Sequence, residues 1–288
     1  MKPVIIYPPT IDWDYLHQRP QQMLKALAGM GCHCFFCNVN MHKRYPVGYI
    51  NNSPNLIISN NLGLDATVQR ARELHPNHPI VIYFTYPPQI NNLPISDLVV
   101  FDSVDEPLDE FSEWLPDYTN AVQKADIVIA TSRSIANRIQ ALDKPVHLIP
   151  NGCDYEHFSI AQTLQKINSV PFNQPKPIIG YIGTIAPWVD MRLINTMARS
   201  LPNYEFVIIG PLLKQPGLAL LNKNMYYLGH RHYSVLPQYL SNFSYCLIPF
   251  KMTEMTKGVN PIKLWEYLAS GIPILSTPIP EVPWNTLP

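Results

Sequence analysis

The sequence predicts an α/β protein built from two doubly wound parallel-sheet domains in tandem. Short apolar runs of strand length alternate with amphipathic helical segments, the alternation lapses once near the middle of the chain, and it then restarts. Strands that alternate with helices form parallel sheets with helices on both faces. At 288 residues the chain is long enough for two such domains.

In the first half, the expected strands and helices follow one another with few interruptions. Strands are expected at 4–7, 32–39, 56–59, 80–84, 98–101, 127–131 and 146–149. Helices are expected at 19–28, 64–75, 117–124 and 132–142, the last with Thr131 or Ser132 as its N-cap. Together they form a first domain over residues 1–160.

A polar stretch with Pro171, Pro175 and Pro177 then interrupts the pattern, and we interpret 161–177 as a linker. The second domain covers 178–288. Its strands are expected at 178–183, 205–210, 225–229, 245–250 and 272–277, and its helices at 190–200, 216–222, 235–241 and 261–270. No helix is expected after the last strand, so this C-terminal domain reads as incomplete.

Composition excludes several classes of protein. Hydrophobic residues make up 47% and charged residues 15% of the chain, and the formal net charge is zero. A neutral, weakly charged chain has no strong field for nucleic acid. No apolar run approaches the roughly 20 residues of a membrane-spanning helix, and the first strand begins too early for a signal peptide. We therefore expect a cytoplasmic protein.

Three of the five cysteines lie close together in Gly-Cys-His-Cys-Phe-Phe-Cys, residues 31–37. A thiolate metal site with His33 is one interpretation. The segment is an expected strand, however, and its side chains alternate between faces, so Cys32 and Cys34 point away from His33 and Cys37. That arrangement does not form a tetrahedral site. We predict buried cysteines, with neither metal nor disulfide bonds.

The expected helix at 261–270 has a defined start and stop. Asn260 can cap it, Pro261 suits its first position, and Gly271 suits the residue past its end. Lying between two strands, it should begin at the carboxyl edge of a parallel sheet. Lys263 and Glu266 share one face, which suits a phosphate beside a pair of sugar hydroxyls. The alternative is a solvent-exposed Lys–Glu pair on an ordinary helix.

Several motifs together carry a resemblance to a known family. They are Trp13 with Gln-Arg-Pro-Gln at 18–21, Phe-Asp-Ser-Val-Asp-Glu at 101–106, Gly-Tyr-Ile-Gly at 180–183, Phe-Val-Ile-Ile-Gly-Pro at 206–211, and Pro-x-Lys-x-x-Glu at 261–266. In this order and spacing, the chain resembles glycosyltransferases with two Rossmann-like domains (GT-B) of the large retaining family (family 4/1-like). It is most similar to bacterial teichuronic-acid and exopolysaccharide biosynthesis enzymes, from residue 1 to about 283.

The resemblance implies roles in the second domain. Glu266 matches the glutamate that holds the nucleotide ribose, and Asn260 lies in the loop whose amides face the diphosphate. Gly183 and Thr184 match the turn that lets phosphate or sugar approach closely. The usual cations of the loop at 186–190 are absent, so Lys263, Lys257 and Arg231 would have to neutralise the diphosphate.

The second departure is Gly258, which stands where the family carries a first sugar-binding glutamate. That role is lost or moves to Glu254. In the first domain, Asp102 and Asp105 should follow a strand end, where a carboxylate can orient the acceptor or act as its base. A capping or loop-stabilising role is the alternative. Arg19 could contact acceptor or phosphate, or form a surface salt bridge.

The resemblance thus implies transfer of a sugar from a nucleoside-diphosphate sugar to a glycan or lipid-linked acceptor, with retention, in cell-envelope polysaccharide biosynthesis. No metal or other cofactor is expected. Donor and acceptor would bind to the second and first domains, and the enzyme could associate peripherally with the inner face of the membrane. One alternative is a non-catalytic or truncated relative that binds nucleotide or a partner without turnover. A nucleotide-sugar epimerase is another.

Overall fold

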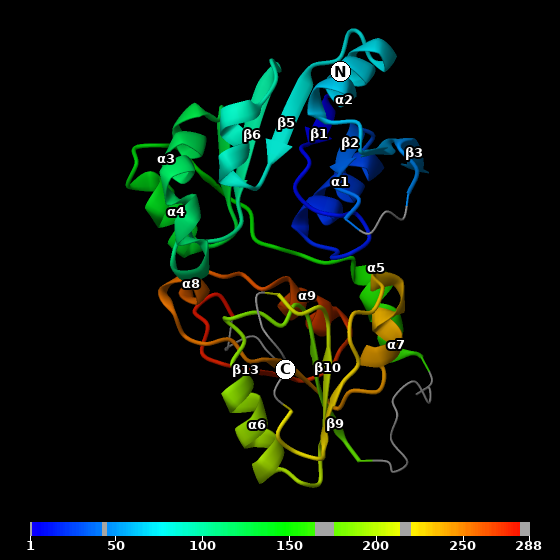
Figure 1. Ribbon diagram of the computed structural model, residues 1–288, viewed down its shortest axis with the longest axis vertical. Helices are drawn as coiled ribbons and strands as arrows, with labels where there is room; N and C mark the ends of the chain where they lie inside the picture. Colours follow the sequence, from blue (N-terminus) through cyan, green and yellow to red (C-terminus); the bar gives the residue numbers. More distant parts are fainter. Residues whose placement is uncertain (1, 42–44, 165–175, 214–219, 283–288) are drawn as a thin grey trace. The chain divides into compact units, whose positions relative to one another are not determined.

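The computed structural model describes residues 2–41, 45–164, 176–213 and 220–282. The chain divides into two compact units, Met1–Pro150 and Asn151–Pro288, which Figure 1 draws in blue to green and in green to red. Each unit is an α/β domain built on its own mainly parallel sheet. The predicted fold class is confirmed.

The first unit contains, within its described residues, an eight-stranded sheet. Its strands are β1 (Val4–Tyr7), β2 (His33–Asn38), β3 (Gly48–Ser53), β4 (Leu56–Asn60), β5 (Ile80–Phe84), β6 (Leu98–Ser103), β7 (Ile127–Ala130) and β8 (His147–Leu148). Its α-helices are α1 (Arg19–Gly29), α2 (Leu64–Leu74), α3 (Leu115–Lys124) and α4 (Arg133–Gln140), with 3₁₀ turns η1 (Pro87–Asn92) and η2 (Asp109–Trp114).

The strand order of this sheet is β3-β4-β2-β1-β5-β6-β7-β8. The chain adds strands on one side of β1, then returns to add β5 on its other side, so the topology switches between β1 and β5. Strands β1 and β5 are buried throughout. In an open parallel sheet, such a switch point opens a crevice at the carboxyl ends of the strands.

The structure adds an element that the sequence pattern did not predict. Strand β3 pairs antiparallel with β4 at the edge of the sheet and is mostly exposed. Its sequence, Gly-Tyr-Ile-Asn-Asn-Ser, carries few apolar residues because an edge strand buries little. The other strands of this unit occur where they were expected. Ser132 caps α4 by accepting a hydrogen bond from the Ile135 amide.

The second unit contains, in the part that the structure describes, a five-stranded parallel sheet. Its strands are β9 (Ile178–Ile182), β10 (Glu205–Ile209), β11 (Met225–Tyr227), β12 (Tyr245–Ile248) and β13 (Ile274–Ser276). Its helices are α5 (Tyr155–Ser159), α6 (Met191–Ser200), α7 (Leu236–Leu240), α8 (Glu254–Lys257) and α9 (Ile262–Ala269), with 3₁₀ turns η3 (Ile160–Gln162) and η4 (Tyr233–Val235).

Two predicted segments of this unit lie partly outside the described residues. They are the helix at 216–222 and the linker at 161–177. The short helix α5 was not predicted. It begins where Asp154 accepts a hydrogen bond from the His157 amide, and it buries Phe158 in the core of the second unit.

One close contact in the core of the second unit depends on a missing side chain. Gly180 lies in the middle of β9, and a Cβ atom placed there would come 1.9 Å from the Phe243 ring. Because protein cores are packed as densely as organic crystals, no larger residue fits at 180 while the ring holds its place. The glycine therefore makes room for the phenylalanine.

The cysteine cluster is buried, as predicted. Cys32, Cys34 and Cys37 lie in the core of the first unit, and all five cysteines, each within the described residues, are free thiols. Burial raises the pKa of the Cys34 and Cys37 thiols to about 12. Thiols in this state are poor nucleophiles at neutral pH, so these cysteines serve as core side chains.

Candidate functional site

The second unit has its own topological switch point, between β9 and β12. The sheet order is β11-β10-β9-β12-β13, so the chain passes from β11 back across β9 to start β12. The turn after β9 and the segment from β12 to α9 meet at this place. Ligands of such sheets bind outside the carboxyl ends of the strands at the switch. Gly183, Thr184 and Lys263 all belong to these two segments.

Two glycines bring the backbones of neighbouring turns into contact. Gly183 follows β9 with φ +154° and Gly210 follows β10 with φ +142°, both in the region that favours glycine. A Cβ atom on Gly210 would lie 1.9 Å from the Gly183 carbonyl oxygen. The Gly183 amide donates to the Ile209 carbonyl over 2.9 Å. Because of this close packing, the Gly183 turn lies directly at the carboxyl ends of β9 and β10.

Lys263 lies directly against the Gly183 turn. A Cβ atom on Gly183 would come 2.9 Å from the Lys263 Cε atom. The ammonium nitrogen lies 4.6 Å from the centroid of the Phe250 ring and 5.7 Å from that of Tyr181. Cation–π contacts of this length hold the ammonium group in place. The structure thus brings together a cation and a glycine turn that the sequence placed 80 residues apart.

Glu266 lies one turn further along the same helix and is 8% exposed. Within the described residues, its carboxylate has an electrostatic neighbour in Lys263 but no hydrogen-bonding partner. Burial raises the pKa of the Glu266 carboxyl to about 7, and the Lys263 charge opposes this only in part. A buried carboxylate without donors is costly, so the geometry leaves it ready to accept hydrogen bonds from a ligand.

The start of α9 corrects one prediction. Asn260 does not cap the helix: Pro261 is the N-cap, and no side-chain cap bond is present in this described segment. The Asn260 Oδ1 atom instead accepts hydrogen bonds from the Asn151 amide at 3.2 Å and from Trp265 Nε1 at 3.0 Å. The helix ends as predicted, with Gly271 at φ +71° just past it.

The other cations expected near the diphosphate already have protein partners. Arg231 donates from Nε to the Tyr239 hydroxyl at 2.7 Å and from Nη1 to the His230 carbonyl at 3.1 Å. Lys257 pairs with Glu254 at 2.5 Å, and both side chains are exposed. The Thr184 carbonyl accepts a hydrogen bond from the Tyr181 hydroxyl at 2.8 Å. Lys263, which packs against the Gly183 turn, is the one of these three cations that the structure places at the switch point.

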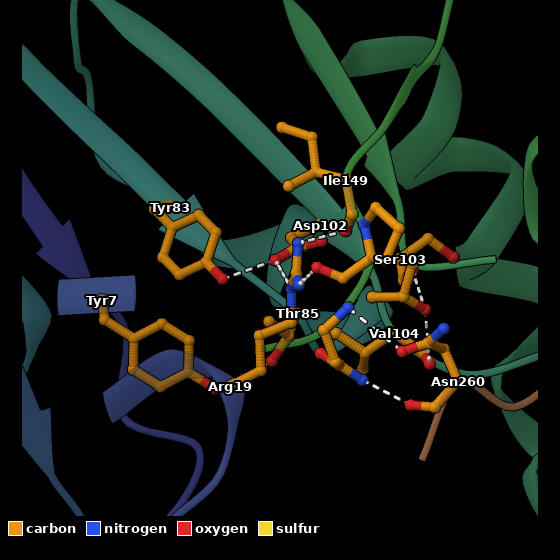
Figure 2. Close-up of polar contacts among 12 residues, drawn as sticks. Tyr7, Arg19, Tyr83, Thr85, Asp102, Ser103, Val104, Ile149 and Asn260 are labelled. Atoms are coloured by element: carbon orange, nitrogen blue, oxygen red, sulfur yellow. Dashed lines mark hydrogen bonds and ion pairs between the residues drawn. The ribbon is translucent and has the colours of Figure 1, made fainter. Parts of the chain in front are cut away.

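In the first unit, Asp102 and Arg19 form a buried ion pair (Figure 2). Asp102 is at the end of β6 and 0% exposed, and its Oδ2 atom accepts hydrogen bonds from Arg19 Nε at 2.6 Å and from the Tyr83 hydroxyl at 2.5 Å. Arg19 is neither exposed nor part of a surface salt bridge. This geometry suits a positioning role for both residues better than direct contact with an acceptor.

Asp105 lies in the loop after β6 and is half-buried. Its neighbour Glu106 is 2% exposed and binds two side chains of α4, accepting from Ser134 at 2.7 Å and from Arg138 at 2.5 Å. Glu106 therefore ties the loop to α4. Of the predicted acidic pair, Asp105 is the better candidate to reach a ligand, because Asp102 lies inside the protein.

The sequence pattern missed the aromatic residues that support Lys263. Tyr181 lies inside β9 and Phe250 just after β12, and both look like ordinary core residues in the sequence. Only the switch in strand order brings them under the same ammonium group.

Among the described residues, no group of three or more His, Cys, Asp or Glu side chains could hold a metal ion. Likewise, no helix in the described ranges is long and apolar enough to cross a membrane.

Comparison with known proteins identifies the second unit. Residues 176–285 match the protein family described as "Glycosyl transferases group 1". These residues form a group 1 glycosyltransferase domain. The match contains the Gly183 turn and the whole of α9, so the predicted nucleotide-sugar residues lie inside this glycosyltransferase domain.

The chain is also a distant homologue of TuaH of Bacillus subtilis (strain 168), which is provisionally named a teichuronic acid biosynthesis glycosyltransferase. The two are 26% identical over 222 residues, covering 69% of this chain and 56% of TuaH. The match thus spans little more than half the length of this relative.

Solved structures establish the architecture as GT-B. Sucrose-phosphate synthase from Thermosynechococcus elongatus matches with a TM-score of 0.71 at 16% identity, over 100% of this chain and 84% of the enzyme. WaaG, a glycosyltransferase involved in lipopolysaccharide biosynthesis, matches with a TM-score of 0.61 at 13% identity, over 98% of this chain and 83% of its own. The GT-B prediction is confirmed.

Proposed function

We propose that the protein transfers a sugar, with retention of configuration, from a nucleoside-diphosphate sugar to a glycan or lipid-linked acceptor. The second unit binds the donor and the first unit the acceptor. The observation that carries this proposal is the arrangement of Lys263, Gly183 and Glu266 at the β9–β12 switch point. It offers a cation for phosphate and, for hydroxyl groups, a buried carboxylate that accepts no hydrogen bond from the described residues.

Each part of this arrangement has a chemical task. The Lys263 ammonium neutralises charge that develops on a departing diphosphate, which is the main requirement of this transfer. Gly183 has no side chain, so phosphate oxygens or the sugar can approach its backbone. The Glu266 carboxylate accepts the two adjacent ribose hydroxyls as donors. Asn260, with its side chain engaged by Asn151 and Trp265, positions the start of the helix.

A donor panel tests the proposal. We expect one of UDP, GDP or dTDP, or one of their sugars, to raise the melting temperature, because a ligand that binds only the folded state stabilises it. Lys263→Met should lose about 10-fold to 100-fold in affinity for that nucleotide, the size of a lost charge-assisted hydrogen bond. The matched control, Lys223→Met, removes an exposed lysine of the same unit and should bind as the wild type does. No shift across the panel contradicts the proposal.

The loops after β5 and β6 in the first unit favour an acceptor without negative charge. Phe111 and Trp114 stack with ring centroids 4.3 Å apart, and Tyr86 meets Trp114 edge-on at 5.6 Å. All three rings are half-buried. Residues 105–117 carry six acidic side chains and no basic one, and one of the six, the buried Glu106, is neutralised by Arg138. Aromatic faces suit sugar rings, whereas this charge repels acidic polymers and anionic membranes. We therefore propose an uncharged glycan as the acceptor.

This acceptor preference can be measured as a ratio of rates. We expect a neutral oligosaccharide to be at least tenfold better as acceptor than a uronate-containing one of equal length at low salt. The ratio should fall several-fold in the double variant Ser112→Lys and Glu113→Lys, both at exposed positions of η2. Thr196→Lys with Ser200→Lys, exposed on α6, is the control and should leave it unchanged. A preference for the uronate acceptor contradicts the proposal.

One observation favours a second candidate, a relative that binds nucleotide without turnover. The loop at 186–190 has no cation, and the Arg231 guanidinium is engaged by Tyr239 and His230. Of the three cations proposed for the diphosphate, Lys263 would then carry most of the charge on the leaving group. Nucleotide binding with neither transfer nor hydrolysis of any donor sugar supports this candidate.

A further inference from the structure

The peptide group between Ile182 and Gly183, at the end of β9, is hydrogen-bonded through both of its polar atoms. Its carbonyl oxygen, on Ile182, accepts a hydrogen bond from the Tyr267 hydroxyl at 3.2 Å. Its N–H, on Gly183, donates to the Ile209 carbonyl of β10 at 2.9 Å. The Ile182 amide donates in turn to the Tyr267 hydroxyl at 2.9 Å. A side chain of α9 and a backbone group of β10 therefore hold this peptide from opposite edges.

Tyr267 of α9 occupies a place that a strand residue would otherwise fill. The described pairing between β12 and β9 ends at Cys246 and Gly180. The Ile182 backbone, two residues further on, faces the same side of the strand, and there the Tyr267 hydroxyl takes the place of a β12 residue. Tyr267 is 0% exposed, and burial raises the pKa of its hydroxyl well above the ordinary value. The hydroxyl therefore stays neutral and can both donate and accept.

The peptide group between Thr184 and Ile185 is held in a similar way. The Thr184 carbonyl accepts a hydrogen bond from the Tyr181 hydroxyl at 2.8 Å, and the Ile185 amide donates to the Pro211 carbonyl at 2.8 Å. Because a peptide group is planar and rigid, hydrogen bonds at its two opposite edges fix the orientation of the whole group. Two tyrosine hydroxyls, one from β9 and one from α9, thus hold the turn at its two ends.

The peptide group between Gly183 and Thr184 lies in the middle of this turn. Its N–H, on Thr184, has no hydrogen-bond partner among the described residues. Its carbonyl oxygen packs against Gly210, where a Cβ atom would come within 1.9 Å of it. The peptide is trans, and in a trans peptide the N–H points opposite to the carbonyl, so this donor faces away from β10. Since the Lys263 side chain packs against Gly183, the donor lies beside a cation.

We propose that the Thr184 N–H donates to a phosphate oxygen of the ligand, and that Tyr181 and Tyr267 are positioning residues that hold this donor beside Lys263. The donor is in place before the ligand arrives, so little reorganisation accompanies binding. A hydrogen bond from a backbone N–H to an anionic oxygen is about twice as strong as a neutral one. The inference deepens the proposed function and rests on it for the identity of the ligand as a diphosphate.

Binding of inorganic pyrophosphate to the full chain, followed through the Thr184 backbone amide by nuclear magnetic resonance, tests the proposal. The protein is produced with isotope-labelled threonine, and the Thr184 signal is the one that Thr184→Ser removes from the spectrum. We expect pyrophosphate to shift the Thr184 amide proton downfield. In Tyr267→Phe this shift should shrink, and pyrophosphate should bind at least about fivefold more weakly, because part of a hydrogen bond to a charged group is lost.

A matched control separates positioning from general loosening of the fold. Tyr118→Phe removes a hydroxyl that is 1% exposed and lies 2.8 Å from the Ser103 hydroxyl, in the first unit. It should lower stability and leave both the affinity for pyrophosphate and the Thr184 shift unchanged. Should Tyr267→Phe fail to fold, Tyr181→Phe removes the hydrogen bond to the Thr184 carbonyl instead and should also reduce the shift.

The outcomes distinguish this inference from the proposed function. A Thr184 amide that does not respond to pyrophosphate overturns the inference, and so does a response that is the same in the folded tyrosine variant as in the wild type or is reduced equally by Tyr118→Phe. Binding of UDP, GDP or dTDP without a Thr184 shift supports the proposed function and overturns the inference. A Thr184 response to pyrophosphate, with no binding of these nucleotides, contradicts the proposed function and supports the phosphate donor.

Discussion

Replacing Glu266 by glutamine is expected to change nucleotide binding and protein stability in opposite directions. Above pH 7 the wild-type carboxylate is charged and accepts hydroxyl donors. Hydrogen bonds to charged groups contribute about 1.5–3 kcal/mol, so Glu266→Gln should weaken nucleotide binding about 10-fold to 100-fold at pH 8. Isothermal titration calorimetry with the nucleotide that stabilises the protein measures this loss. Transfer activity should fall by at least the same factor.

The pH dependence of binding follows from the raised pKa. Because burial raises the pKa of the Glu266 carboxyl to about 7, this group becomes protonated as the pH falls below 7. The ligand prefers the charged form, so affinity should drop up to tenfold for each pH unit between 7 and 5. Glu266→Gln should bind with a flat profile over this range. An equally steep profile in the variant assigns the pH dependence to another group.

In the absence of ligand, Glu266→Gln should raise the stability of the folded protein. The unfolded carboxyl titrates near 4.5 and the folded one near 7, so the folded protein binds the extra proton between these values. Stability therefore falls as the pH rises from 4.5 to 7 and levels off above it. The cost at pH 8 is at most about 3 kcal/mol, and Glu266→Gln should recover it in urea denaturation. Glu156→Gln, an exposed control in α5, should change neither property.

Removing Arg19 should have the largest effect on stability. Arg19→Met leaves the Asp102 carboxylate, 0% exposed, without its ion-pair partner. Breaking a buried pair from one side costs about 3–5 kcal/mol, because the remaining charge is buried and unpaired. The unfolding transition of the first unit, followed in urea, measures this loss. The double variant Arg19→Met with Asp102→Asn should recover much of it.

The exposed pair Arg70–Glu73 in α2 provides the control for this prediction. Its side chains are 44% and 50% exposed, and such pairs contribute about 0–1 kcal/mol. Arg70→Met should therefore cost less than 1 kcal/mol. If Arg19→Met costs no more than Arg70→Met, the buried ion pair does not stabilise the first unit in the way described.

Most of the fold could be predicted because each buried parallel strand appears in the sequence as a short run of apolar residues. Runs such as Ile80–Phe84 are apolar at every position, and the structure confirms both the predicted position and the predicted strand conformation. Strand β3 was missed because an exposed edge strand needs no such run. The short helix α5 was missed because its single buried residue, Phe158, cannot form the periodic pattern of apolar residues that predicts a helix.

The candidate site was predicted in part, for a similar reason. Lys263 and Glu266 share one helix face in any helix of this register, so their spacing alone placed them together. The Arg19–Asp102 pair spans 83 residues of sequence, and no local pattern indicates which strand end an arginine will meet. Asn260 resembled an N-cap by composition, but the amide of Asn151, 109 residues away, takes up its oxygen.

The contact between Gly180 and Phe243 constrains how this protein family can vary. Alanine can replace Gly180 only after a smaller residue has replaced Phe243. Loss of the Phe243 ring leaves a cavity in the core until a new side chain fills it. Each single replacement passes through a destabilised intermediate. Among homologues that share the β9 strand, the two positions should therefore change as a pair, and their joint substitution should mark a shared line of descent.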